Sequence, residues 1–347
     1  MLVGSVDSEM RLIKEIAGRF SRHPLQKNGL LEADSEILDL SNTVLRYLVL
    51  KTDSICEEIK EKLYEDPYVI GWMAVTVTLS DLAATGAVAH GLLLTLQIPR
   101  ETDEAWLSRF QDGINEACNL YDVYILGGDT NFDNSVSVST TAVGTVNEGI
   151  PLMRKNITPG DLLFVTGPLG SGNAYAYSRY LDPRLNIGYA PIARLCEGRL
   201  LKDCASACID TSDGLFPALS VLSELNNIGF DFEQDLEHLL HHDARRVAIE
   251  GKIPTWMLLA GPHGEYELLF AVKPEQKQAM QEQFEHFGAP IYLAKATESK
   301  AIQFTSGALD VSCAPSLIAN LYHQSNGDVS SYFELLKHQH QKWCVTE

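Results

Sequence analysis

Apolar residues recur along this chain at two spacings, one typical of helices and one typical of strands. Residues 104–121 carry apolar side chains every three or four positions, which predicts an amphipathic helix, whereas residues 135–146 alternate with the period of a half-buried strand. Helices are predicted over residues 8–20, 71–86, 104–121, 173–181, 216–226 and 325–347. Strands are predicted over residues 36–40, 47–51, 90–97, 123–126, 135–146 and 162–166, with a further strand from Ala205 and mixed helix and strand up to about Ser316.

This order of elements predicts an α/β protein with mixed sheets. A change of organisation comes near Pro151, where a turn signal at residues 158–161 leads into an apolar strand. Each half mixes strands with helices and is long enough for a core of its own. We therefore predict an N-terminal domain over residues 1–150, a C-terminal domain over 151–324, and an appended helical tail over 325–347.

Composition narrows the classes of function. The formal net charge of −19 disfavours non-specific binding to nucleic acid or to anionic lipid, because those partners are anionic too. The longest apolar stretch, residues 70–98, is interrupted by Ser80-Asp81 and His90, so a buried helix and strand are predicted there and no membrane span. Seven irregularly spaced cysteines predict neither a disulfide framework nor a zinc site. With no signal peptide apparent at the start, a cytoplasmic protein is expected.

The candidate chemistry lies in aspartates that stand beside small residues, most of them after an apolar run. They occur in Thr52-Asp53, Ser80-Asp81, Gly127-Gly128-Asp129-Thr130 and Asp210-Thr211-Ser212-Asp213-Gly214. Carboxylates brought together repel one another unless cations lie between them, and Mg²⁺ with a polyphosphate is the usual solution. The pattern therefore predicts an enzyme that uses a metal and a nucleotide.

Each motif also has a purely structural interpretation. The Gly127-Gly128 pair either binds an anion or makes a plain turn, and residues 210–214 either hold a metal or cap the next helix. Ser80-Asp81 favours function, because an unpaired carboxylate in an apolar segment is costly to bury. Thr52-Asp53 taken alone is better explained as part of a surface loop.

Two further segments carry weaker signals. Residues 167–173 form a glycine-rich loop between a strand and a helix, the context of a phosphate-binding loop, but they lack its Lys-Ser/Thr. Residues 264–270 place Glu265 and Glu267 just before a buried strand, where edge-strand charges and a substrate contact are equally good interpretations. The histidines at 241–242 and at 338 and 340 are expected at helix ends or in the tail.

In their order, these motifs resemble the family that includes thiamine-monophosphate kinase and, more distantly, aminoimidazole ribonucleotide synthetase. The resemblance covers residues 8–297 and is carried by the segments 70–87, 127–130, 159–167, 209–215 and 266–269, with the N-terminal residues 9–13 also similar. It implies two α/β domains of the PurM-like architecture, a homodimer formed through the N-terminal sheets, and ATP and Mg²⁺ as cofactors. It further implies direct transfer of the ATP γ-phosphate to a phosphorylated small molecule.

The resemblance also implies roles for individual residues. Asp213 and Asp210 are the expected catalytic residues. The expected metal ligands are Asp34, Asp53, Asp81, Asp129 and Asp213. Nucleotide contacts are expected from Gly127, Gly128, Thr130, Arg154, Gly167, Gly170 and Ser212, and acceptor contacts from Lys60, Glu265 and Tyr266.

The motifs that differ most from the family lie on the acceptor side, at residues 57–60 and 262–267. The expected function is therefore an ATP- and Mg²⁺-dependent phosphotransferase that acts on thiamine phosphate or, as a paralogue, on another small molecule. One alternative is an ATP-dependent synthetase that activates an amide or carbonyl oxygen. The other is a nucleotide-binding scaffold without catalysis.

Overall fold

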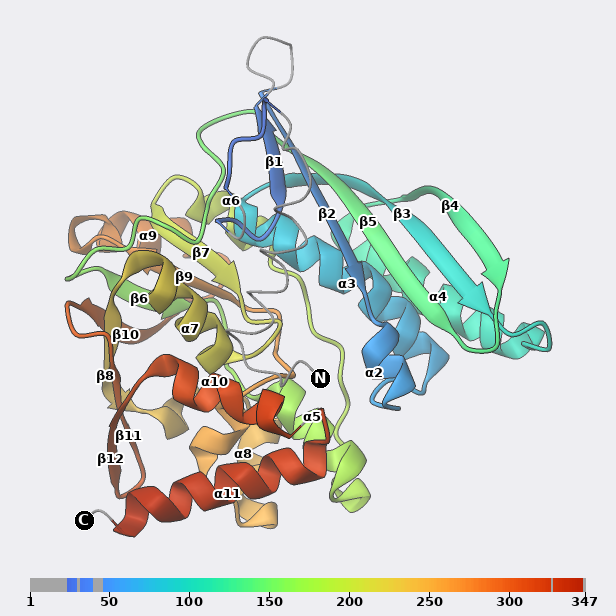
Figure 1. Ribbon diagram of the computed structural model, residues 1–347. Helices are drawn as coiled ribbons and strands as arrows, with labels where there is room; N and C mark the ends of the chain where they lie inside the picture. Colours follow the sequence, from blue (N-terminus) through green and yellow to red (C-terminus); the bar gives the residue numbers. More distant parts are fainter. Residues whose placement is uncertain (1–23, 30–31, 40–45, 326, 346–347) are drawn as a thin grey trace.

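Two β-sheets with helices packed against them make up the protein (Figure 1). This computed structural model describes residues 24–29, 32–39, 46–325 and 327–345. The predicted α/β class with mixed sheets is confirmed, and the chain passes from one sheet to the other between residues 146 and 162. The helix predicted over residues 8–20 lies outside the described residues.

The first sheet has five strands in the order β1-β2-β5-β3-β4. Its strands are β1 (Glu36–Asp39), β2 (Tyr47–Ser54), β3 (Val88–Ile98), β4 (Ile125–Phe132) and β5 (Ser137–Val146), and its helices are α2 (Cys56–Lys60), α3 (Pro67–Thr85) and α4 (Glu104–Tyr121). All neighbouring strands are antiparallel except β3 and β4, which are parallel. Because β4 is an edge strand, one side of its backbone has no partner strand in the described chain.

Helix α3 forms the centre of this half of the molecule. Asp66 caps its start by accepting the N–H of Tyr68, and Gly86 ends it in the left-handed conformation with φ +73°. Every residue from Ile70 to Thr85 is buried. Among the described helices, α3 alone is long and apolar enough to cross a membrane, but 89% of its apolar window is buried inside the protein, as expected for a core helix.

Glycines allow α3 and α4 to approach closely. A Cβ at Gly71 would lie 2.1 Å from the carbonyl oxygen of Phe110, and one at Gly113 would lie 2.1 Å from that of Tyr68. No side chain fits at such distances, so the two helices pack backbone against backbone. This contact fixes α3, which carries Ser80 and Asp81 toward the second sheet.

The second sheet has seven strands in the order β12-β11-β8-β10-β6-β9-β7. Its strands are β6 (Leu162–Val165), β7 (Ala205–Asp210), β8 (Gly229–Asp235), β9 (Leu268–Val272), β10 (Ile291–Thr297), β11 (Ile302–Ser306) and β12 (Leu309–Cys313). The helices of this half are α5 (Ser171–Tyr180), α6 (Leu195–Leu201), α7 (Leu215–Asn226), α8 (His242–Gly251), α9 (Lys277–Gln283), α10 (Pro315–Gln324) and α11 (Val329–Val345). Short 3-10 helices lie at Pro183–Leu185, Leu236–Leu239, Thr255–Leu259 and Pro274–Gln276.

The predicted C-terminal helix is α11, which packs across the second half of the molecule (Figure 1). Its apolar face buries Tyr332 and Leu336. Near its end, Trp343 packs against Trp256 with tilted rings whose centroids lie 4.8 Å apart, and it meets Phe304 edge-on at 6.1 Å. The tail is therefore an integral part of the second hydrophobic core.

Some predicted strand ends are wrong. Thr52-Asp53, taken alone, was expected in a surface loop, but both residues lie within β2. Residues 123–126 were expected to form a short strand that ends at a Gly-Gly-Asp-Thr loop, but β4 runs on through these residues to Phe132. Its pairing with β3 continues from Gly127 to Phe132. Gly128 allows a close approach of the two backbones, because a Cβ there would lie 1.8 Å from the carbonyl oxygen of Leu94. The glycines therefore serve strand pairing along this segment.

Candidate functional site

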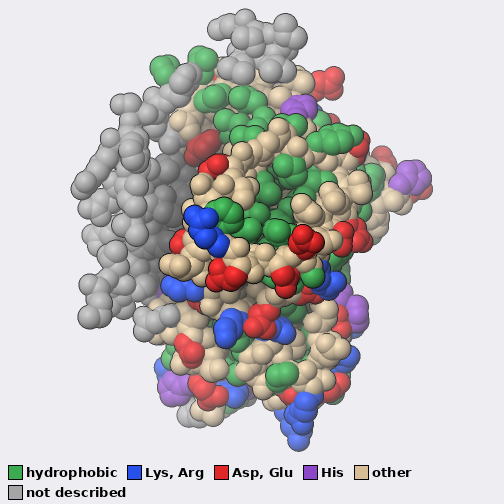
Figure 2. Space-filling model, turned by 90° about the vertical axis from the view of Figure 1, so that its right-hand side faces the viewer, with side chains coloured by type: hydrophobic (Ala, Val, Ile, Leu, Met, Phe, Trp, Pro, Cys, Tyr) green, Lys and Arg blue, Asp and Glu red, His purple; other side chains and the backbone are tan. Residues whose placement is uncertain are grey.

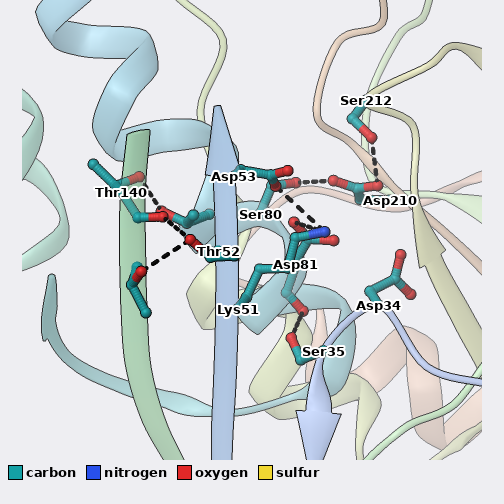
Figure 3. A network of polar contacts seen from close by, with 12 residues as sticks. Asp34, Ser35, Lys51, Thr52, Asp53, Ser80, Asp81, Thr140, Asp210 and Ser212 are labelled. Atoms are coloured by element: carbon teal, nitrogen blue, oxygen red, sulfur yellow. Dashed lines mark hydrogen bonds and ion pairs between the residues drawn. The ribbon is translucent and has the colours of Figure 1, made fainter. Parts of the chain in front are cut away.

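Three buried carboxylates meet between the two sheets. Asp34 lies just before β1, Asp81 lies in α3, and Asp210 ends β7. Each offers one oxygen atom that lies within 4.8 Å of the other two, and none of the three residues is more than 6% exposed. Residues distant in the sequence thus form one acidic site, which we call the aspartate cluster (Figure 3).

Hydroxyl groups hold the Asp210 carboxylate in position and join the segments that carry the cluster. Ser80 donates to one oxygen of Asp210 at 2.6 Å, and Ser212 donates to the other at 2.8 Å. Ser35 donates to the backbone carbonyl of Asp81 at 3.2 Å, which ties the segment before β1 to α3. Because Ser80 and Asp81 are consecutive, one turn of α3 contacts Asp210 and also supplies a carboxylate.

Two cationic side chains adjoin the cluster. The Lys51 ammonium lies 3.3 Å from Asp53 Oδ2 and 3.2 Å from Asp81 Oδ2. Arg154 forms a hydrogen-bonded ion pair with Asp34, while its buried Nε has no partner among the described residues. Burial alone would lower the pKa of Lys51, but the charges of Asp81 and Asp53 outweigh it and raise that pKa. Both side chains therefore stay charged.

Two of these carboxylates, Asp81 and Asp210, are in an environment that favours their protonated form. Burial, with the charge of Asp34, raises the pKa of Asp210 to about 6. Burial also raises the pKa of Asp81, where the charges of Asp210 and Asp53 oppose the effect of Lys51. Without a further cation, this cluster is electrostatically strained.

The donor set suits Mg²⁺. All candidate ligands are carboxylate oxygens, which hard divalent cations prefer, and one oxygen of each lies within 4.8 Å of the others. The unpartnered Nε of Arg154 suits an anion such as a phosphate oxygen. Oxygen ligands together with a buried arginine are typical of sites for metal-bound phosphates.

Not every predicted metal ligand lies in the aspartate cluster. Asp129 is exposed on β4, together with Gly127, Gly128 and Thr130. Since β5 and β3 separate β4 from β2, Asp129 lies about 14 Å across the sheet from Asp53. Asp213 is exposed just before α7. The roles of these residues remain predictions.

The glycine-rich loop binds a carboxylate of its own chain. The N–H of Gly170 donates to Glu265, whose other oxygen accepts from Thr211 at 3.1 Å. Burial raises the pKa of Glu265 to about 8, although these two hydrogen bonds lower it in part. The loop at Gly167 and Gly170 therefore connects to the aspartate-rich loop through Glu265.

Edge-strand charge, one of the two interpretations of residues 264–270, is wrong. Glu265 and Glu267 are both buried, at 4% and 5% exposure. Glu267 accepts two hydrogen bonds from Arg194 and one from Thr166 at 2.5 Å. Its side chain also fills the space beside Gly167, where a Cβ would lie 2.6 Å from the carboxylate. These acids organise the loops of the second half.

The predicted acceptor residues have unlike environments. Lys60 is exposed at the end of α2, whereas Tyr266 is buried with a left-handed φ of +62°. Near them, Tyr189 stacks between Tyr64 and Tyr175, with centroid distances of 6.2 and 4.9 Å. The hydroxyl of Tyr189 donates to the carbonyl of Gly264 at 2.8 Å, which connects this stack to Glu265.

Lys51 and the Ser80–Asp210 contact were not among the features of the site predicted from the sequence. A signal for Lys51 was present, because it follows Tyr47 and Val49 at the strand period and precedes Asp53 on the same face. The contact of Ser80 with Asp210 had no comparable signal, since the two residues lie 130 positions apart.

Glu58 lies outside the aspartate cluster and has no cationic partner among the described residues. Its Oε2 is buried with no hydrogen-bond partner among the described residues. Burial, with the charges of Glu57 and Glu61, raises its pKa from 4.5 to about 7. The folded protein therefore binds an extra proton between these two values, and its stability falls as the pH rises through this window.

We expect Glu58→Gln to stabilise the protein at pH 8 by about 1–3 kcal/mol, because a neutral amide avoids the buried charge. The gain should shrink as the pH falls from 7 toward 4.5. Urea unfolding at a series of pH values measures it, with exposed Glu57→Gln as the matched control. A gain independent of pH, or an equal gain in the control, would contradict this account.

This chain is similar in sequence to proteins of known function. The family described as AIR synthase related protein, N-terminal domain, matches residues 34–146. The thiamine-monophosphate kinase of Escherichia coli (strain K12) is 34% identical over 239 residues, covering 65% of this chain and 71% of that enzyme. That of Bacillus subtilis (strain 168) is 27% identical over 312 residues, covering 85% and 94%.

The fold itself is similar to a solved structure, AaThiL complexed with AMPPCP and TMP. The TM-score is 0.70 at 20% sequence identity, and the match covers 86% of this chain and 92% of that one. This likeness confirms the predicted PurM-like class of fold.

Proposed function

Because this chain belongs to the thiamine-monophosphate kinase family, we propose that it transfers the γ-phosphate of ATP to the phosphate of thiamine monophosphate at the aspartate cluster. The protein is an ATP-dependent kinase by this membership. The observation that carries the choice of site is the meeting of Asp34, Asp81 and Asp210 within 4.8 Å. Divalent cations, by preference Mg²⁺, are the ions that these oxygens would hold.

For this phosphoryl transfer the protein mainly has to position the two substrates and neutralise their negative charge. An oxygen of the acceptor phosphate forms the new bond to the γ-phosphorus while the bond to the β-phosphate oxygen breaks and ADP leaves. That acceptor oxygen is already ionised at neutral pH, so no general base is needed. When bound, Mg²⁺ neutralises charge on the phosphates. Asp81 and Asp210 would be its ligands, and Ser80 and Ser212 hold the Asp210 carboxylate in position.

We assign the remaining residues by their positions. Arg154 suits a phosphate oxygen through its unpartnered Nε. Asp129, Thr130 and Asp213 are exposed. The Thr130 hydroxyl would donate to the polyphosphate of ATP, and the two aspartates would contact it through divalent cations. Glu265 connects the glycine-rich loop to the aspartate-rich loop, and the tyrosine stack beside it is the proposed acceptor side.

The direct test incubates the protein with ATP, Mg²⁺ and thiamine monophosphate and measures thiamine diphosphate by chromatography. Formation of the diphosphate, dependent on all three, is the expected result. Tight Mg²⁺-dependent ATP binding without turnover would point to another acceptor, to a synthetase reaction or to a scaffold. Absence of ATP binding would contradict the proposal altogether.

We also propose a homodimer formed through the first sheet. Apolar side chains on and beside β3 and β4 are 36–68% exposed: Val88, Leu93, Tyr124, Ile125, Leu126 and Phe132. Figure 2 shows hydrophobic side chains gathered over this side of the molecule. An edge strand with such a patch favours pairing with a second copy. Sedimentation equilibrium is expected to give a dimer, and a monomer at micromolar concentration would contradict this assignment.

We also propose a cytoplasmic location. All seven cysteines are free thiols, and three of them, Cys118, Cys204 and Cys208, are buried. Such usage fits a reducing compartment.

A further inference from the structure

We propose that the Lys51 ammonium takes the place of one divalent cation, between Asp53 and Asp81. The inference rests on the proposed function, in which these aspartates bind divalent ions. It goes further by assigning one cation position to a side chain of this chain. Lys51 thereby acts as a positioning residue, because it sets where the carboxylates lie and how many ions they bind.

The backbone presents Lys51 rigidly. It lies in β2, opposite Ala142 of β5, and Val49 on the same strand face is fully buried. Because side chains two residues apart share a face, Lys51 and Asp53 point the same way, toward the segment of α3 that holds Asp81. The ammonium then lies 3.3 and 3.2 Å from oxygens of the two carboxylates (Figure 3).

This arrangement differs from a surface ion pair. The side chain of Asp81 is only 7% exposed and that of Lys51 25%, so water screens the contact weakly. A lysine that bridges two carboxylates also performs the electrostatic task of a shared metal ion. An ammonium and a divalent cation cannot both lie between the same two oxygens, since each would displace the other.

The formal charges around Lys51 also support its role as a substitute for one divalent cation. The carboxylates of Asp34, Asp53, Asp81 and Asp210 are accompanied by two cationic groups, Lys51 and Arg154. The formal charge that remains is that of two carboxylates, which one divalent ion neutralises. If Lys51 were neutral, a second cation would be needed to balance the same four aspartates.

The test counts bound ions without nucleotide. Mn²⁺, a paramagnetic substitute for Mg²⁺, is titrated into the protein, and the free ion is measured by electron paramagnetic resonance. Lys51→Ser is expected to bind one more Mn²⁺ per chain than the parent protein. Its metal-free melting temperature should be lower and should recover as Mn²⁺ is added. Lys155→Ser removes a lysine paired with Glu32 outside the cluster, so its Mn²⁺ count should equal that of the parent.

Two further variants keep the test decisive. Lys51→Arg retains the charge and should keep the parental count, whereas Lys51→Gln retains the stem without the charge and should behave like Lys51→Ser. Equal counts in the parent, Lys51→Ser and Lys51→Gln would overturn the inference even if the kinase assay succeeds. No Mn²⁺ binding in any of them would instead contradict the metal site of the proposed function itself.

Discussion

Replacement of Asp81 by asparagine is expected to lower kcat/KM for phosphoryl transfer by about 10³-fold or more while the protein stays folded. Asp81 is a buried carboxylate of the aspartate cluster, and an amide of the same shape binds a divalent cation poorly. Burial raises the pKa of Asp81, so its charge destabilises the metal-free protein. The metal-free melting temperature of Asp81→Asn should therefore equal or exceed that of the parent.

The combination of lost turnover and retained stability is the distinguishing result. A coupled assay of ADP release measures the first, and thermal unfolding followed by circular dichroism measures the second. Asp310→Asn is the matched control, since Asp310 is exposed on β12 and far along the chain from the cluster. Turnover within a few-fold of the parent in Asp81→Asn would refute its assignment as a metal ligand.

Gly264→Ala is expected to reduce kcat/KM by about 10²-fold without touching any reacting group. A Cβ at this position would lie 1.5 Å from the carbonyl oxygen of Thr211, so one of the two segments must move. The Gly264 N–H donates to Ser212 at 2.8 Å, and Glu265 follows directly. The added methyl group therefore separates the loop that carries Asp210 from the loop that carries Glu265.

A control of the same chemistry is available in Gly188→Ala. That glycine has nothing within 4 Å of its would-be Cβ, and its backbone does not require the left-handed region. Assays are run well below the melting temperature of each variant, so that partial unfolding does not imitate a catalytic defect. Parental activity in Gly264→Ala would mean that the two loops do not need to stay in contact.

Much of the fold follows from periodicity. The helix predicted over residues 104–121 has those bounds in the structure, because its apolar face is regular and Asp103 caps it by accepting the Trp106 N–H at 2.7 Å. For residues 127–130, by contrast, the local sequence predicted a loop where the structure has a strand. Two consecutive glycines are typical of a loop, and only pairing with β3 extends the strand through them. Pairing between strands is a tertiary effect that local sequence does not encode.

The candidate site, like the fold, was predictable from the sequence only in part. Aspartates beside small residues identified Asp81 and Asp210 as candidates, since carboxylates are rarely left in apolar segments without a purpose. Which of them meet was not predictable, because Asp34, Asp81 and Asp210 come together only when the segment before β1, helix α3 and strand β7 pack. The contact of the glycine-rich loop was not predictable either, since the Gly170 N–H binds Glu265, a carboxylate 95 residues away in the chain.

The docking of α11 places two of the four tryptophans of the chain in one contact. The other two, Trp72 and Trp106, lie in α3 and α4 of the first half. Indole rings 4.8 Å apart couple electronically, so Trp256 and Trp343 should give a near-ultraviolet circular dichroism band that vanishes when the C-terminal helix detaches. The protein thus contains an intrinsic optical reporter of its own C-terminal packing, readable without label, substrate or metal.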